Sequence, residues 1–313
     1  MQTIHDAGVT SLDLSPLFAQ PIRRQTLYAP YHPGQANYIW EIQTDDAAYI
    51  VRSPRLVLPP DEDFWQGALR VFESHTLSPM RTVSINQWLE VHSTWRIPRT
   101  YRVTHWASRD FLIVERLPGD PLQKFSQLSY DSLVQWGRTV ALLHQCRRMV
   151  FGPPQALWDV RAGQPIDQFS TRLLATMRYL TSRYYSEDPI AQRWAARAVN
   201  AGFVMPTIPY ACPMMLDWDP SQMLAINHQL TGLVDTELYV VGPPQLELCS
   251  LEYLLDRASA RAFRRGYNQI APFPDLHPYR LLFRLFLRLM SFRGPVPWNQ
   301  WFDWPAGFAE TKP

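Results

Sequence analysis

Two aspartates and a side-chain amide stand close together along one stretch of the chain. Asp217 follows the apolar run 214–216, Gln222 comes next, and Asp235 follows the apolar pair 233–234. Each aspartate is therefore expected at the edge of a short apolar strand. Phosphoryl transfer uses such groups, because one carboxylate can orient or deprotonate a hydroxyl while an amide and a second carboxylate hold magnesium. The stretch indicates a site for phosphoryl transfer to a hydroxyl.

The composition is that of a folded protein large enough for two lobes. The chain has 313 residues, of which 46% are hydrophobic and 19% charged, and its formal net charge is +2. So small a charge does not by itself argue for a nucleic-acid partner. The late arginines are clustered at helical spacings, and we expect them on the solvated faces of two helices. They are Arg257, Arg261, Arg264, Arg265, Arg280, Arg284 and Arg288.

The cysteines and the apolar runs fit a cytoplasmic protein. Cys146, Cys212 and Cys249 are far apart and form no CxxC pair, so neither a disulfide framework nor a zinc site is predicted. Residues 1–17 contain no basic leader followed by an apolar run. The longest apolar stretch, 281–290, is interrupted by arginines and is too short to span a bilayer. We expect neither a membrane nor a nucleic acid as a partner.

The first third of the chain is expected to be rich in β-strands. Residues 38–43 and 48–52 alternate with period two on either side of the turn residues 44–47, which predicts a β-hairpin. Further strands are expected at 100–104 and 110–115, and helices at 61–75 and 83–93.

The character changes after the sequence Leu-Pro-Gly at 117–119. An amphipathic helix is predicted over 129–149, a second helical region over 167–201, and further helices over 245–290. A β-rich part followed by a helical part predicts two lobes with a cleft between them. We place the boundary between residues 1–117 and residues 118–313.

With its elements in this order, the chain resembles the aminoglycoside phosphotransferase and choline kinase group of small-molecule kinases. That group carries the loop His-Gly-Asp-x-x-x-x-Asn, and residues 215–222 read Met-Leu-Asp-Trp-Asp-Pro-Ser-Gln. Residues 234–237, Val-Asp-Thr-Glu, stand where the group has Ile-Asp-Trp/Phe-Glu. Residues 242–248, Gly-Pro-Pro-Gln-Leu-Glu-Leu, stand where it has Gly-Asp-Pro-x-x-Asp-Leu. The resemblance covers residues 25–290.

The resemblance implies a fold, cofactors and roles for the loop residues. The fold is α+β and protein-kinase-like, with a β-rich N-terminal lobe for the nucleotide and a mainly helical C-terminal lobe for catalysis and the acceptor. The cofactors are ATP and Mg²⁺, and the acceptor is a small molecule with a hydroxyl group. Asp217 is implied as catalytic base, Asp235 as main magnesium ligand, and Gln222 as the counterpart of the metal-binding asparagine.

The resemblance also implies a nucleotide site in the first lobe. Arg52 ends a segment similar to the group's third strand, whose basic residue reaches the α- and β-phosphates, and arginine can bind phosphate with two parallel bonds. Gly34 lies in a reduced form of the turn over the nucleotide. Glu115 and Leu117 lie in the connection between the lobes, where backbone groups read adenine.

Several replacements leave a second hypothesis open. Met215 and Leu216 replace the group's histidine and glycine, and Gln222 carries its amide oxygen one methylene further out than asparagine does. Magnesium tolerates little error in ligand position. The alternative is therefore a kinase-fold protein without transfer activity that binds a nucleotide, another ligand or a protein. A third hypothesis is nucleic-acid binding through the late arginines.

The supporting residues around this site are predicted less sharply. Glu73 and Glu90 are both candidates for the helix glutamate that pairs with Arg52. Asp219 and Glu237 are expected to be solvated or to support the site without acting in catalysis. His144 lies on the apolar stripe of its helix and is expected to be a core histidine with its polar partners satisfied.

Overall fold

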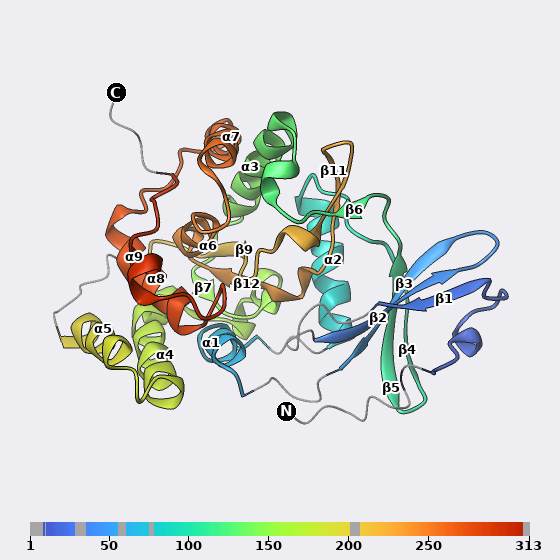
Figure 1. Cartoon of the computed structure of the whole chain (residues 1–313), viewed down its shortest axis with the longest axis horizontal. Coiled ribbons are helices and arrows are strands. Elements are labelled where there is room, and N and C mark those ends of the chain that lie inside the picture. Colours follow the sequence, from blue (N-terminus) through green and yellow to red (C-terminus); the bar gives the residue numbers. More distant parts are fainter. Residues whose placement is uncertain are drawn as a thin grey trace.

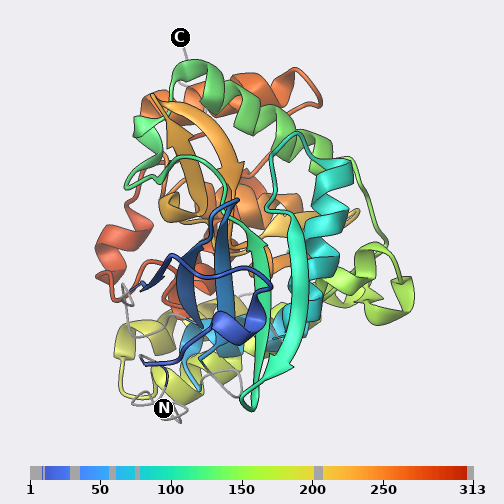
Figure 2. The same ribbon diagram turned by 90° about the vertical axis from the view of Figure 1, so that its right-hand side faces the viewer.

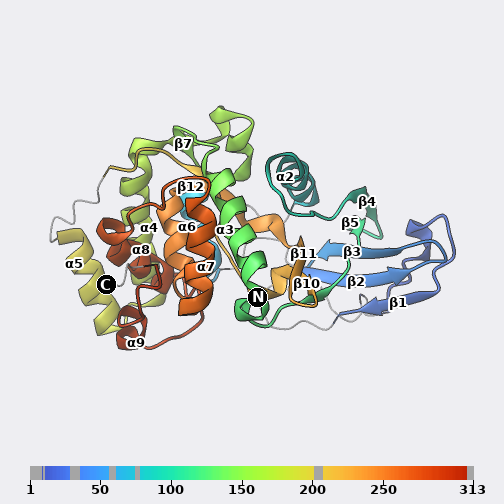
Figure 3. The ribbon, with the colours of Figure 1, turned by 90° about the horizontal axis from the view of Figure 1, so that it is seen from above.

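The computed structural model consists of a β-sheet lobe at one end and a larger helical lobe at the other (Figure 1). Figure 2 looks onto the sheet with the helices behind it, and Figure 3 shows the two lobes side by side from above. This arrangement confirms the predicted α+β, two-lobed fold. The structure describes residues 9, 11–28, 36–55, 61–74, 78–200 and 207–308.

The first lobe is built on one antiparallel sheet with the strand order β1-β2-β3-β5-β4. Strands β2 and β3 form the predicted hairpin, in which Tyr38 pairs with Ser53 and the Thr44 N–H donates to the Ala47 carbonyl at 2.9 Å. Period-two alternation sends Tyr38, Trp40 and Ile42 of β2 to one buried face, where they meet Val51 of β3. The strands are β1 (Arg24–Leu27), β2 (Asn37–Gln43), β3 (Ala48–Pro54), β4 (Thr100–Trp106) and β5 (Arg109–Glu115).

Helix α2 (Pro79–His92) packs against the sheet, where its Val83 meets Leu112 and Val114 of β5. The helix begins four residues earlier than the predicted Val83, because a proline fits the first helical position, where the missing N–H has no partner to lose.

Helix α1 (Asp63–Phe72) lies between β3 and α2 in sequence, yet it packs on the helical lobe beside α4 (Phe169–Tyr184; Figure 1). The Phe72 and Phe169 rings lie 6.2 Å apart. The Asp63 carboxylate accepts hydrogen bonds from the Tyr185 hydroxyl at 2.8 Å and the Ser291 hydroxyl at 2.6 Å. The chain therefore crosses from the sheet lobe to the helical lobe and back before it reaches the connection at 116–119.

Helix α3 (Tyr130–His144) runs along α7 (Arg257–Asn268) at close range. A Cβ on Gly137 would come within 1.9 Å of the Phe263 carbonyl oxygen, so glycine is required there. The helix ends five residues before the predicted Met149. It ends there because the Arg148 N–H leaves the helical pattern and donates to the Ala211 carbonyl at 2.8 Å.

The predicted helical region 167–201 is two helices, α4 and α5 (Pro189–Asn200). The break arises because the Asp188 carboxylate accepts the N–H groups of Ile190 and Ala191, at 2.9 and 3.0 Å, and so caps the start of α5. Pro189 occupies the first position of the new helix.

Short strands and further helices complete the second lobe. The strands are β6 (Asp120–Pro121), β7 (Val150–Phe151), β8 (Gln164–Pro165), β9 (Cys212–Met215), β10 (Met223–Ile226), β11 (Gln229–Leu233) and β12 (Tyr239–Gly242). The helices are α6 (Pro244–Leu251), α8 (His277–Leu289) and α9 (Trp298–Phe302). Strand β9 pairs with β12, and β10 pairs with both β11 and β6.

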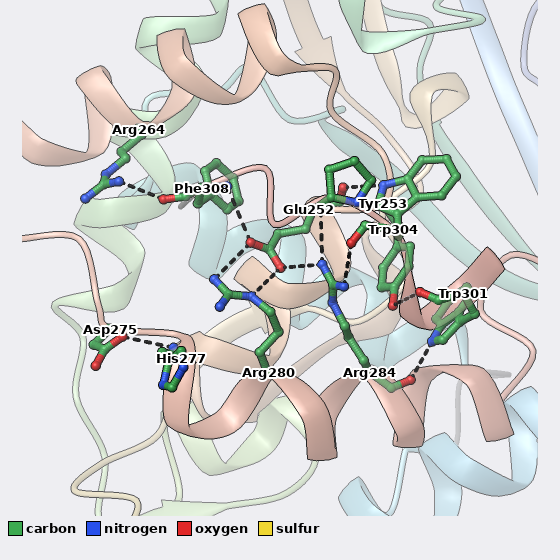
Figure 4. Close-up of polar contacts among 11 residues, drawn as sticks. Glu252, Tyr253, Arg264, Asp275, His277, Arg280, Arg284, Trp301, Trp304 and Phe308 are labelled. Atoms are coloured by element: carbon green, nitrogen blue, oxygen red, sulfur yellow. Dashed lines mark hydrogen bonds and ion pairs between the residues drawn. The ribbon is translucent and has the colours of Figure 1, made fainter. Parts of the chain in front are cut away.

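The late arginines differ between their two helices. Those of α7 are exposed or partly exposed, as predicted, but Arg284 and Arg288 of α8 are only 5% and 6% exposed. Figure 4 shows Arg284 and Arg280 against the buried Glu252 carboxylate. Their guanidinium nitrogens lie 3.0 and 2.9 Å from its Oε2. The prediction of a solvated face on α8 is wrong, because the carboxylate and the Trp304 carbonyl replace the water that the Arg284 guanidinium loses.

The three cysteines are free, and burial raises the pKa of the Cys212 thiol well above its ordinary value. In the described part of the chain, every helix is too short or too polar to cross a membrane.

Candidate active site

The loop between β9 and β10 carries Asp217, and the structure brings this carboxylate close to Asp235 and Asp219. Burial raises the pKa of Asp217 from 3.8 to about 7, and the negative charges of Asp235 and Asp219 add to the effect. Burial acts first because a carboxylate loses hydration there, and like charges further favour the protonated form. A carboxyl that titrates near neutrality can accept a proton from a substrate at physiological pH.

The Gln222 side chain forms two hydrogen bonds inside this loop. It ends the short turn η7 (Pro220–Gln222) and is 3% exposed. Its amide nitrogen donates to the Asp217 carbonyl at 2.5 Å, and its amide oxygen accepts the Asp219 N–H at 3.1 Å. Both ends of the amide are therefore used by the loop that contains Asp217.

Loss of the Gln222 amide is expected to loosen the loop. In Gln222→Ala the Asp219 N–H and the Asp217 carbonyl lose their partners, so we expect the free energy of unfolding to fall by about 1–3 kcal/mol. Urea denaturation followed by tryptophan fluorescence measures this change. Gln123→Ala, on an exposed side chain, is the matched control and is expected to change stability by less than about 0.5 kcal/mol. Equal stabilities for the two variants would contradict this role for Gln222.

Glu247 of α6 forms hydrogen bonds with the strand end and the loop on either side of Asp217. One carboxylate oxygen accepts the Met215 N–H at 2.9 Å and the Trp218 indole N–H at 2.6 Å. The other oxygen lies 2.6 Å from Nε2 of His144, whose Nδ1 lies 2.9 Å from the Tyr267 hydroxyl. His144 is the satisfied core histidine that was predicted.

The importance of Glu247 did not follow from its own neighbours in sequence. The available signal was its position in the segment 242–248, where the related group has an aspartate. Glu247 is 2% exposed and its carboxylate reaches both sides of Asp217 in the chain, at Met215 and at Trp218. Glu247 thus supports the loop on both sides of Asp217.

Asp235 presents its carboxylate from a strained backbone. It follows β11 and precedes the turn η8 (Thr236–Leu238), with φ 60° and ψ 52° in the left-handed region. Aspartate is among the few residues that visit this region, and such outliers cluster at functional sites. The Asp235 side chain is 50% exposed, and its Oδ1 accepts a bond from Nη2 of Arg52 at 2.7 Å.

Arg52 of β3 reaches across to two carboxylates of the second lobe. Nη2 lies 2.7 Å from Asp235 and 3.0 Å from Glu237. Burial alone would lower the pKa of the guanidinium, but the charges of Glu237 and then Asp235 outweigh burial and raise the pKa. Of the two alternatives expected for Glu237, the structure rules out the solvated one, since the side chain is 11% exposed and paired with Arg52.

Neither predicted glutamate is the partner of Arg52. Glu73 pairs with Arg172 at 2.9 Å, and Glu90 lies on an exposed face of α2. Neither candidate fits, because Glu73 follows helix α1, which packs on the other lobe, and Glu90 is exposed.

Hydrogen bonds at Glu115 and at Pro118 hold the connection between the lobes in place. The Glu115 side chain bonds to Arg96, and the Glu115 N–H donates to the Arg99 carbonyl at 2.8 Å. Thr231 of β11 donates to the Pro118 carbonyl at 2.7 Å. Leu117 is buried, and its N–H has no hydrogen-bond partner within the described ranges. Gly34 lies outside the described residues.

The donor set fits a magnesium ion of the kind that bridges protein and phosphate. Asp217, Asp219 and Asp235 bring negative charge to one place, and Oδ2 of Asp235 accepts no hydrogen bond from any described residue. No cluster of three or more histidines, cysteines or acids with metal-holding geometry occurs among the residues that the structure describes. Magnesium commonly binds through one or two carboxylates, substrate phosphates and water, so a sparse protein donor set suffices.

Comparison with known proteins finds a family model that matches most of the chain. The sequence model of the phosphotransferase enzyme family matches residues 28–282. This match confirms the resemblance predicted from the motifs. None of the curated proteins compared with the chain matches it.

Solved structures share the fold at low sequence identity. The macrolide 2'-phosphotransferase of Brachybacterium faecium is 16% identical, with a TM-score of 0.58 over 90% of this chain and 92% of that chain. A GDP complex of an aminoglycoside 2'-phosphotransferase is 13% identical, with a TM-score of 0.63 over 92% and 89%. A ternary complex of an aminoglycoside phosphotransferase with ADP and hygromycin B is 15% identical, with a TM-score of 0.54 over 87% and 88%.

Proposed function

Because this chain belongs to the phosphotransferase enzyme family, we propose that it transfers the γ-phosphoryl group of ATP to a hydroxyl group of a small molecule. The convergence of Asp217, Asp235 and Arg52 in one place, from three separate segments, is the observation that carries the proposal. The complexes of related folds with GDP, and with ADP and hygromycin B, support a nucleotide and a small-molecule acceptor. The proposed place of this reaction is the cytoplasm.

In the proposed reaction Asp217 orients the acceptor hydroxyl and takes its proton late. Its pKa of about 7 in the nucleotide-free protein suits this task, because the group can be ionised before transfer and protonated after it. The transition state of phosphoryl transfer is loose, so positioning of the two oxygens supplies more of the rate than strength of the base does. Gln222 and Glu247 would contribute by holding the Asp217 loop in place.

The nucleotide would lie between the lobes. The proposed contacts are Arg52 with the phosphates, the free Leu117 N–H with the adenine, the backbone at Glu115, and the turn that contains Gly34. In this arrangement residues 1–117 form the nucleotide-binding lobe and residues 118–313 the catalytic and acceptor lobe. Buried charge-assisted bonds from Arg52 would favour a triphosphate over a neutral ligand.

The magnesium ion would supply positive charge that offsets the charge of the nucleotide phosphates. Asp235 would hold it through the carboxylate oxygen that has no hydrogen bond. Gln222 would serve as a second ligand by turning its amide oxygen away from the Asp219 N–H, at the expense of one loop hydrogen bond.

A second function is favoured by one specific observation. Arg52 and Asp235 are bonded to each other at 2.7 Å, and this pair would also keep the fold stable in a protein that binds a nucleotide or another ligand without transferring phosphate. The replacements at Met215 and Leu216 agree with such a protein.

Thermal unfolding with ATP, with ATP and MgCl₂, and with ATP and EDTA tests the proposed function. At 100 times its dissociation constant, a ligand of the native state stabilises it by about 2.7 kcal/mol. We expect a rise in Tm with ATP and MgCl₂ that EDTA reverses, because the metal links the phosphates to Asp235. Failure of every nucleotide to change the Tm would refute phosphoryl transfer from ATP. Stabilisation by ATP without release of ADP, across a panel of aminoglycosides, macrolides and amino alcohols, would favour the binding protein.

A further inference from the structure

We propose that Glu237, in the turn after Asp235, is the positioning residue for Arg52, a task for which the sequence offered Glu73 and Glu90 as candidates. The inference rests on the proposed function, in which Arg52 meets the phosphates. It assigns a task to a residue whose sequence context indicated only a solvated or supporting side chain.

The Glu237 carboxylate is fixed by groups from three other elements. Nη2 of Arg52 on β3 lies 3.0 Å from Oε1, and Nδ2 of Asn37 on β2 donates to Oε2 at 3.0 Å. The Thr82 hydroxyl of α2 bonds to the same carboxylate. A carboxylate held by several donors has one orientation, so the guanidinium that pairs with it is also held in one orientation.

Helix α2 has no acid with which to replace Glu237. Its inner face carries Thr82 and Asn86, both buried and uncharged, and its one acid, Glu90, is exposed. Asn86 accepts a hydrogen bond from the Thr236 hydroxyl of η8. The helix is therefore attached to the Asp235–Glu237 turn and has no direct ion pair with Arg52.

The two carboxylates that meet Arg52 differ in exposure. Asp235 is 50% exposed and Glu237 is 11% exposed. An ion pair in a solvated place contributes little and exchanges readily, whereas a buried pair is costly to break. Asp235 is thus free to leave Arg52 for a metal, and Glu237 remains as its lasting partner.

The two carboxylates do not use every N–H group of the Arg52 guanidinium. Its Nη2 serves both carboxylates, while its Nε is buried and has no hydrogen-bond partner among the described residues. An unpaired buried N–H is unfavourable, and a phosphate oxygen would satisfy it only after the side chain or its surroundings move, because the protein encloses the atom. Glu237 would hold one side of the guanidinium so that its other N–H groups face the nucleotide.

Calorimetric titration with AMP-PNP and MgCl₂ tests this assignment. Glu237→Gln keeps the shape and the Asn37 contact but removes the charge, so we expect AMP-PNP to bind about tenfold more weakly. Glu90→Gln removes the only acid of α2 and is the matched control, with unchanged binding expected. In an Arg52→Met background Glu237→Gln should weaken binding less than about twofold, because the residue through which it acts is gone.

Equal losses of affinity from Glu237→Gln in the two backgrounds would overturn the inference, as would full affinity in the single variant. Wild type, Arg52→Met, Glu237→Gln and the double variant are also compared by Tm without nucleotide. The losses of Tm from the two single substitutions should not add in the double variant if the two side chains are partners. This arm separates two failures. A wild-type protein that binds no AMP-PNP refutes the proposed function, whereas strictly additive Tm losses refute the pairing of Glu237 with Arg52.

Discussion

Replacing Asp217 with asparagine is expected to lower the rate of phosphoryl transfer by a factor of about 10²–10⁴ and to leave nucleotide affinity nearly unchanged. The amide has the size of the carboxylate but cannot take a proton. The substitution also removes the negative charge of Asp217. Arg52 is bonded to Asp235 and Glu237, so it keeps its carboxylate partners in the variant. Steady-state measurement of ADP release, together with calorimetric titration of AMP-PNP, separates turnover from binding.

The same substitution is expected to raise stability at alkaline pH. The pKa of Asp217 is raised from 3.8 to about 7 in the folded protein, so the folded state binds more protons than the unfolded state between these values. The free energy of unfolding therefore falls as pH rises from about 4 to about 7, and Asp217→Asn removes that fall. We expect the variant to be more stable than wild type at pH 8 and equal to it near pH 4.

Asp303→Asn, on an exposed turn, is the control for both measurements. It should match wild type in turnover and in the pH dependence of Tm. Undiminished turnover of Asp217→Asn would exclude this residue as the catalytic base. Parallel stability curves for Asp217→Asn and wild type would show that the carboxylate is not destabilised by burial and by its acidic neighbours.

Removal of the Glu247 carboxylate is expected to be the most destabilising single change at the site. In Glu247→Ala the Met215 N–H, the Trp218 indole and the His144 ring all lose their partner inside the core, where no water replaces it. Loss of one member of such a buried network costs about 3–5 kcal/mol. Urea denaturation measures the loss, and turnover should fall with it because the Asp217 loop loses its support.

Glu187→Ala provides the comparison, since Glu187 is an exposed glutamate away from the site and should change stability by less than about 0.5 kcal/mol. If Glu247→Ala were equally harmless, the loop would have to be held by Gln222 and the β9–β12 pairing alone. Glu247→Gln isolates the charge, because an amide oxygen can serve the Met215 and Trp218 donors while its NH₂ group faces His144.

Local pattern predicted the elements that carry the site. The hairpin at 37–54 followed from period-two alternation and turn residues, and Asp217 and Asp235 were placed together because each follows a short apolar strand. These inferences succeed because they depend on neighbours in sequence. Helix ends were less accurate, since the end of α3 depends on a bond from Arg148 to Ala211 in a distant segment.

Partners of charged side chains could not be predicted in the same way. The contact between Arg52 and Asp235 joins residues separated by 183 positions. The choice of Glu237 over Glu73 and Glu90 depends on the lobe against which α1 packs and on the exposed face of α2 on which Glu90 lies. Arg284 was misjudged for the same reason. A helical arginine is normally solvated, and only the fold reveals that Glu252 lies opposite it.

Helix α1 bears on how the molecule folds. Its buried residues Trp65, Ala68, Val71 and Phe72 find their contacts in the helical lobe, although α1 comes directly after strand β3 of the sheet lobe in the order of elements. A fragment ending at residue 117 would expose this apolar surface to water, and the remaining fragment would lack a piece of its own core. We therefore expect the two lobes to unfold as a single cooperative unit.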